Sequence, residues 1–153
     1  MNPNQSLWEL LSYGDRGWSD ELLHGLWLTV QISVCTYLVG FCFGLVGAGM
    51  KLSGNRVLMR IGDVYTTLIR ALPELLLLFL LYYAGTDMVR FVLIGLGIAG
   101  EDVQINAFAA AVLALGFILG AYMTEVLRGA ILSVPKGQIE AARAYGMHFG
   151  LRF

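Results

Sequence analysis

Charged residues are scarce in this chain. They make up 14% of its 153 residues, against 58% hydrophobic residues, and the mean hydropathy is +0.70. A soluble domain usually has about a quarter of its residues charged. So few charges cannot coat a water-soluble globule, which favours a membrane protein. The net charge of −1 gives no reason to expect a nucleic-acid partner.

Cysteine and histidine are also rare. Cys35 and Cys42 lie seven residues apart in one apolar run, which is two helical turns, or roughly 10 Å. This distance is too long for a disulfide, and we interpret both as small buried hydrophobic residues. His24 and His148 lie far apart in sequence, so no metal site is predicted. No motif of a hydrolase, nucleotide-binding loop or metalloprotease is present. We therefore expect no catalytic residue and no cofactor bound by this chain.

The first 21 residues lack the features of a cleavable signal peptide. They carry four acidic residues against the single cation Arg16, whereas a signal peptide begins with positive charge and ends at a small-residue cleavage site. We expect residues 1–21 to form an N-terminal segment outside the membrane.

Three apolar stretches are long enough to cross a membrane, which takes about 20 residues as a helix. They are residues 22–50, 64–85 and 104–124. The ten residues from Phe91 to Gly100 are too few to span, and we interpret them as a loop or a shallow segment. The prediction is an all-α integral membrane helical bundle.

The distribution of Lys and Arg predicts the orientation, because cationic loops stay in the cytoplasm. The connection 51–62 carries three cations and no acid, and the tail after residue 124 carries four cations. The N-terminal segment and the connection 86–103 carry one cation each. We expect the N-terminus and residues 86–103 outside, with residues 51–62 and the tail inside.

Glycines recur at GxxxG spacing in two of the predicted spans. Gly40 and Gly44 lie in the first span, and Gly116 and Gly120 lie in the third. Lipid gives helices no hydrophobic reason to associate, so close backbone packing has to hold them together. The pattern indicates a bundle, although glycine is also simply common in membrane helices.

The second predicted span contains Arg70, Pro73 and Glu74. A charge at membrane depth costs at least a few kcal/mol. Arg70 and Glu74 are four residues apart and could pair on one helical face, while Pro73 would kink the helix. One interpretation is a permeation or gating element. The alternative is a snorkelling arginine beside a packing kink.

Further polar residues occur at the end of the third span. Glu125 and Arg128 are three residues apart and could also pair on one helical face. They lie nearer the cytoplasmic face, so a neutralised helix end is the stronger interpretation there. Tyr122 is either a cavity lining or a packing residue.

The tail predicts a short cytoplasmic helix at about 133–149. Pro135 suits a helix start, and Gly146 suits a stop in the left-handed region. Between them, Glu140, Ala141 and Ala142 are good helix formers. The two alanines leave a small-residue face that a partner could approach closely.

These residues carry a resemblance. Glu140-Ala141-Ala142 followed by Gly146 is similar to the EAA loop of ABC importer permeases. Residues 65–74, 120–131 and 135–138 resemble the polar amino acid branch of that family. Residues 45–56 resemble the Q-type subunit of histidine/lysine/arginine/ornithine permeases, with opine permeases next.

The resemblance implies a type I ABC importer permease fold (MetI-like) of five helices, of which this chain holds three. It implies a second permease subunit, a cytoplasmic ATPase dimer that uses ATP, and a periplasmic amino-acid-binding protein, all at the bacterial inner membrane. The expected activity is uptake of basic or polar amino acids. The coupling positions would be Pro135, Glu140, Ala141, Ala142 and Gly146. Candidates for the translocation path would be Arg70, Pro73, Glu74, Tyr122, Glu125 and Arg128.

Two departures from the family pattern stand out. Ala71 replaces an expected glycine, and the chain stops at Phe153, before two further spans. We therefore expect a C-terminally truncated permease. The alternatives are a non-transporting truncated membrane anchor, an opine permease subunit, or a passive channel or carrier.

Overall fold

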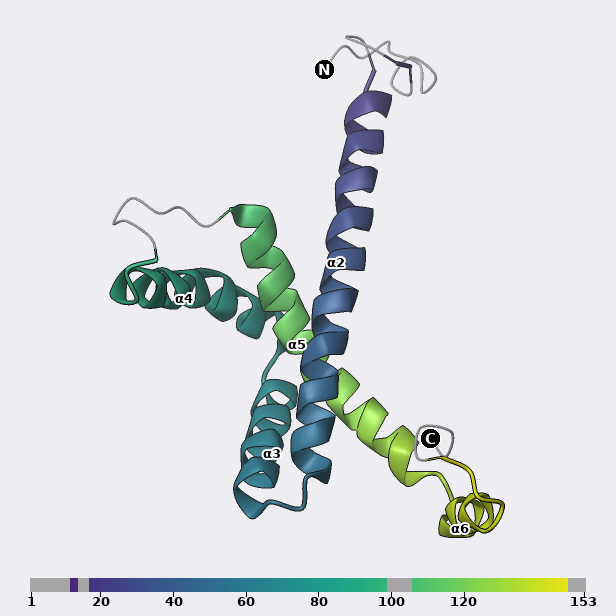
Figure 1. Ribbon diagram of the computed structural model, residues 1–153. Helices are drawn as coiled ribbons and strands as arrows, with labels where there is room; N and C mark the ends of the chain where they lie inside the picture. Colours follow the sequence, from purple (N-terminus) through teal and green to yellow (C-terminus); the bar gives the residue numbers. More distant parts are fainter. Residues whose placement is uncertain (1–11, 14–16, 99–105, 149–153) are drawn as a thin grey trace.

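The computed structural model describes residues 12–13, 17–98 and 106–148, and this part of the chain contains helices and no strand. The all-α prediction is therefore confirmed. Most of the expected N-terminal segment 1–21, and residue 149 at the end of the expected coupling loop, lie outside the described residues. The helices are α2 (Ser19–Leu52), α3 (Arg56–Ala71), α4 (Glu74–Gly95), α5 (Ala107–Leu132) and α6 (Lys136–Ala144), drawn in Figure 1.

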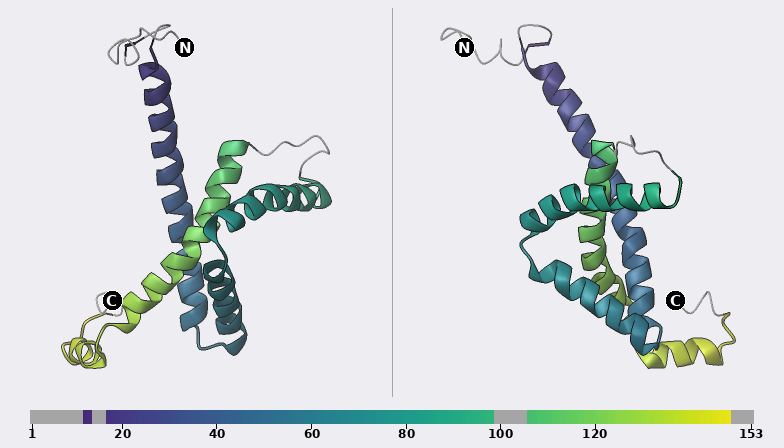
Figure 2. Two further views of the ribbon diagram at one scale, coloured as in Figure 1. Left: turned by 180° about the vertical axis from the view of Figure 1, so that it is seen from behind. Right: turned by 90° about the vertical axis from the view of Figure 1, so that its left-hand side faces the viewer.

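Three of these helices, α2, α4 and α5, are long and apolar enough to cross a membrane. Helices α2 and α5 cross each other at mid-length and form the main packing contact of the molecule (Figures 1 and 2). Helix α4 packs against the part of α5 that precedes residue 122. Helices α3 and α6 lie toward the end of the molecule opposite the N-terminus (Figure 1).

The crossing of α2 and α5 is made by the two GxxxG pairs. A Cβ atom added to Gly44 would lie 2.5 Å from the Cβ of Met123, and one added to Gly120 would lie 2.5 Å from the Cβ of Phe43. No real side chain fits at such distances, so only glycine lets the two backbones approach this closely. The predicted helix association is confirmed.

A tight turn joins α2 to α3. Gly54 has φ +70°, a conformation that other residues rarely adopt. The side chain of Asn55 accepts a hydrogen bond from the backbone N–H of Val57 at 2.9 Å and caps α3. The turn therefore brings the last residues of α2 beside α3.

The structure differs from the sequence-based expectation at residues 64–85. This stretch is not one kinked helix, because α3 ends at Ala71 and α4 begins at Glu74. Leu72 is extended, with φ −97° and ψ 149°, since the ring of Pro73 disfavours helical geometry in the residue before it. The candidate membrane span is accordingly Glu74–Gly95.

The expectation of a loop or shallow segment over Phe91–Gly100 is also wrong in part, because α4 continues through Gly95. Gly97, two residues after the end of the helix, has φ +68° and prevents it from continuing. The N–H groups of Gly97 and Ile98 donate to the carbonyls of Ile94 and Leu93, each at 3.0 Å. These two bonds form a Schellman motif. Residues 99 and 100 lie outside the described part.

Helix α5 is longer than the predicted span 104–124. It starts after Asn106, whose side chain accepts a hydrogen bond from the N–H of Phe108 at 2.8 Å. It ends at Leu132, so Glu125 and Arg128 lie inside the helix and not at its end. Its last two turns carry α6 away from the other helices (Figure 2).

Candidate functional site

Helix α6 forms as the sequence predicts. Pro135 precedes its first residue, with φ −61° and ψ 136°, and Gly146 follows its end with φ +72°. The N–H of Gly146 donates to the carbonyl of Arg143 at 2.9 Å, and the N–H of Met147 donates to Ala142 at 3.0 Å. This Schellman motif satisfies carbonyls that the helix end would otherwise leave unpaired.

No residue of α6 is buried. Glu140 and Ala141 are exposed, Ala142 is half-buried, and a Cβ on Gly137 or Gly146 would meet nothing within 4 Å. Figure 2 shows α6 apart from the crossing helices. The predicted coupling residues are therefore accessible to a partner.

Two of the predicted path residues, from different helices, come together. The guanidinium carbon of Arg70 in α3 lies 5.8 Å from the ring centroid of Tyr122 in α5, within the range of a cation–π contact. The expected pair of Arg70 with Glu74 is absent from the described part of the chain. The break at Pro73 explains this, since Arg70 and Glu74 no longer share one helix.

The predicted pair of Glu125 and Arg128 exists, with a guanidinium nitrogen 3.7 Å from a carboxylate oxygen. The main partner of Glu125 is Lys51, the penultimate residue of α2, which also lies 2.9 Å from a carboxylate oxygen of Asp63. Sequence reasoning missed Lys51 and Asp63 as site residues. The available signal in the sequence was Gly54, because a glycine turn there folds α3 back beside Lys51 at the end of α2.

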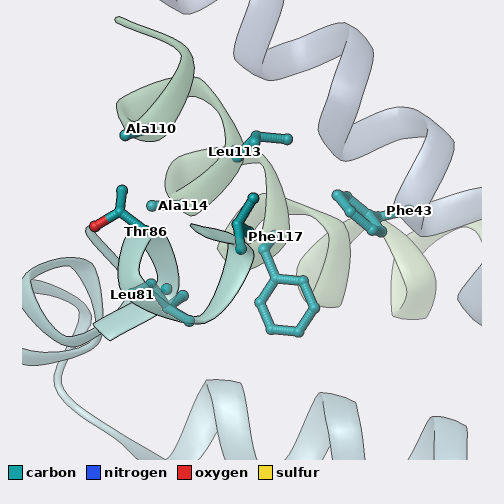
Figure 3. A pocket seen from close by; sticks show the side chains of 9 residues that line it. Phe43, Leu81, Thr86, Ala110, Leu113, Ala114 and Phe117 are labelled. Carbon is teal, nitrogen blue, oxygen red and sulfur yellow. The ribbon is translucent and has the colours of Figure 1, made fainter. Parts of the chain in front are cut away.

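A separate groove lies between α2, α4 and α5 (Figure 3) and has a volume of about 220 Å³. None of the six predicted path residues lines it. The hydroxyl of Thr86 already donates to the carbonyl of Tyr82 at 2.7 Å. The groove thus offers no free polar group to a charged amino acid. Its lining is Phe43, Leu81, Gly85, Thr86, Val89, Ala110, Leu113, Ala114 and Phe117.

Residues 40–152 match the family of binding-protein-dependent transport system inner membrane components. This chain belongs to that family. The match covers the crossing, the α3–α4 break and α6. With its three candidate spans, the chain is an integral membrane protein with the helical fold of an ABC importer permease.

Named relatives agree with this assignment. The nopaline transport system permease protein NocQ of Agrobacterium fabrum is 45% identical over 94% of this chain and 61% of its own length. The histidine/lysine/arginine/ornithine permease protein HisQ of Salmonella typhimurium is 43% identical over 90% of this chain and 59% of its own length. This chain thus spans about three-fifths of the relatives it matches.

A solved structure agrees as well. The chain is similar to one in a crystal structure of an amino acid ABC transporter with histidines, with a TM-score of 0.66 and 30% identity. The similarity covers 88% of this chain and 57% of the other. The described helices are therefore arranged similarly to those of that transporter chain.

Proposed function

We propose that this chain acts in an ATP-driven importer as a permease subunit that moves basic or polar amino acids into the cytoplasm. The observation that carries the proposal is α6. It bears the EAA residues and a glycine stop, lies directly after a candidate membrane helix, and buries none of its own residues. A helix so exposed at the end of a bundle suits a docking element for another subunit.

The orientation forms part of the proposal. The turn between α2 and α3 and helix α6 lie at the end of the molecule opposite the start of α2 (Figure 1). Most of the cations also belong to residues 51–62 and to the tail, which favours a cytoplasmic location for that end. Residues 1–21 would then be periplasmic, in a bacterial inner membrane.

The proposed partners follow from the same function. A second permease subunit would complete the path, and a cytoplasmic ATPase dimer would hydrolyse ATP and contact α6. A periplasmic binding protein would deliver the amino acid. This chain would bind no cofactor itself. Histidine, arginine, lysine and ornithine are the proposed substrates, and nopaline is included in the test because the two relatives named above are nearly equally similar.

The test is uptake of labelled substrate by the complete permease assembled with its ATPase and binding protein in vesicles. The four amino acids and nopaline are tested separately. We expect uptake of at least one of the four amino acids that depends on ATP and on the binding protein, and uptake of nopaline alone would favour an opine permease. Uptake that continues without the ATPase would contradict the proposal and favour a passive channel or carrier.

A matched pair of glycine variants tests the role of α6 in the same vesicles. Gly146→Ala disturbs a residue with φ +72°, whereas Gly137→Ala lies within α6 and meets no neighbour. We expect Gly146→Ala to lower uptake and association with the ATPase, and Gly137→Ala to preserve both. Equal behaviour of the two variants would remove α6 from the proposal.

A further inference from the structure

One lysine joins three helices near the end of α2. The side chain of Lys51 is only 8% exposed, and its ammonium group lies 2.9 Å from a carboxylate oxygen of Asp63 in α3. The same ammonium donates to a carboxylate oxygen of Glu125 in α5. We call Lys51, Asp63 and Glu125 the three-helix clamp.

The surrounding backbone leaves room for this lysine. A Cβ on Gly62 would lie 2.9 Å from the Cγ of Lys51, so the glycine makes space for the aliphatic part of the lysine. One turn earlier in α2, Gly47 contacts the buried Thr124 of α5 closely. The ammonium is therefore held between closely packed helices, and the lysine cannot swing freely into solvent.

The charges in the clamp depend on Lys51. Two carboxylates share one buried ammonium. The other cation in the ion pairs of the described residues is Arg128, which is 41% exposed and 3.7 Å from Glu125. Without Lys51, Asp63 and Glu125 would face each other with no buried cation between them. Two carboxylates that have lost their shared cation repel each other, which favours separation of α3 from α5 at this point.

The clamp lies where α5 leaves the packed body. Eight residues of α5 up to Thr124 are buried, whereas none from Glu125 to Leu132 is buried. Beyond the clamp, α5 continues for two turns and carries α6 (Figures 1 and 2). We call residues 125–132 of α5 together with α6 the arm. The clamp ties this arm to α3 at the point where the buried packing of α5 ends.

We propose that Lys51 is a positioning residue for coupling. Lys51 holds Asp63 in α3 and Glu125 in α5 together. When α6 is displaced, α3 and the α3–α4 break therefore move with it, and the displacement is not lost in bending of α5. This inference rests on the proposed function of α6 and adds the residue that transmits its motion.

The first experiment measures the position of the arm and needs no transport. Spin labels at Leu68→Cys in α3 and Gln138→Cys in α6 report their distance, with Cys35 and Cys42 replaced by alanine. Labelled chain is diluted with unlabelled chain in the assembled transporter. Lys51→Met should shift and broaden the distance distribution, and an unchanged distribution would overturn the proposal.

The second experiment measures ATP hydrolysed per amino acid imported in the assembled transporter. Lys51→Met should raise this ratio at least about fivefold, the low end of typical coupling between sites. Arg56→Met is the matched control, because it removes an exposed cation of the same cytoplasmic segment outside the clamp. Its ratio should not change.

The outcomes separate the two proposals. If Lys51→Met lowers uptake and hydrolysis in parallel, so that the ratio stays constant, the lysine serves folding or topology alone and the inference fails. If the unsubstituted transporter imports no amino acid, the proposed function fails. The distance measurement then still decides whether Lys51 sets the direction of the arm.

Discussion

Helix α5 is held at two places by opposite means. At its crossing with α2 there are no charges, and glycines bring the backbones so close that a single methyl group would not fit. At the three-helix clamp, the contacts are ion pairs whose carboxylates are 26% and 59% exposed. Close packing in lipid gives one fixed geometry, whereas partly solvated ion pairs hold helices together more weakly. We call the crossing the pivot, and the clamp ties the arm beyond it to α3.

The largest expected effect is at the pivot. Gly44→Val would place a Cβ 2.5 Å from the Cβ of Met123, whereas Gly49→Val on the same helix meets nothing within 4 Å. Overpacking should lower the free energy of unfolding by about 3 kcal/mol for Gly44→Val. Denaturant unfolding of both variants in detergent measures the difference. If both variants lost the same stability, the crossing would not be the pivot.

The next effect is at the clamp. Lys51→Met should lower the free energy of unfolding by about 2 kcal/mol, below the 3–5 kcal/mol of a fully buried broken pair because both carboxylates reach solvent. A double-mutant cycle with Glu125→Gln measures the coupling. Glu125→Gln should be less costly when Lys51 is already replaced, and additive losses would show that the two side chains do not interact.

A smaller effect is expected near the pivot. The hydroxyl of Tyr65 in α3 donates to the backbone carbonyl of Phe117 in α5 at 2.6 Å. Tyr65→Phe removes this bond and should lower the free energy of unfolding by about 1 kcal/mol. Tyr83→Phe is the control, since Tyr83 is 64% exposed, and it should leave stability unchanged. A loss from Tyr83→Phe as large as that from Tyr65→Phe would contradict the assignment.

The smallest effect on stability is expected on the arm. Gly146→Ala should destabilise the end of α6 by about 1 kcal/mol, since alanine is disfavoured at φ +72°. Gly137→Ala should stabilise α6 by a similar amount, because alanine is the better helix former. Hydrogen exchange of the α6 amides measures both changes. Exchange at the crossing should stay the same, and a change there would mean that arm and pivot are not separate.

Local signals in the sequence predicted the close helix crossing and the bounds of α6. The GxxxG pairs predicted close helix packing, and the contacts of Gly44 and Gly120 confirm it. Pro135 and Gly146 predicted the bounds of α6, because a proline start and a left-handed stop depend only on neighbouring residues. These features need no knowledge of distant parts of the chain.

The remaining features depend on longer-range structure or on a choice between local conformations. Pro73 predicted a kink, whereas the extended backbone of Leu72 gives a break between two helices. Glu125 and Arg128 suggested a helix end, but Lys51 neutralises Glu125 and α5 continues past both. Lys51 and Glu125 lie 74 residues apart, so no local pattern pairs them. The translocation roles of all six path candidates stay predictions, namely those of Arg70, Pro73, Glu74, Tyr122, Glu125 and Arg128.

The most direct test of the central claim is cross-linking from the arm to the ATPase in the assembled transporter. Cys35 and Cys42 are first replaced. A single cysteine at Gln138 in α6 is then compared with a single cysteine at Thr29 in the N-terminal half of α2. We expect a cross-link to the ATPase from position 138, none from position 29, and a change in the yield of the cross-link when ATP is added. Labelling of position 138 by an impermeant reagent from outside, with no cross-link, would contradict that claim.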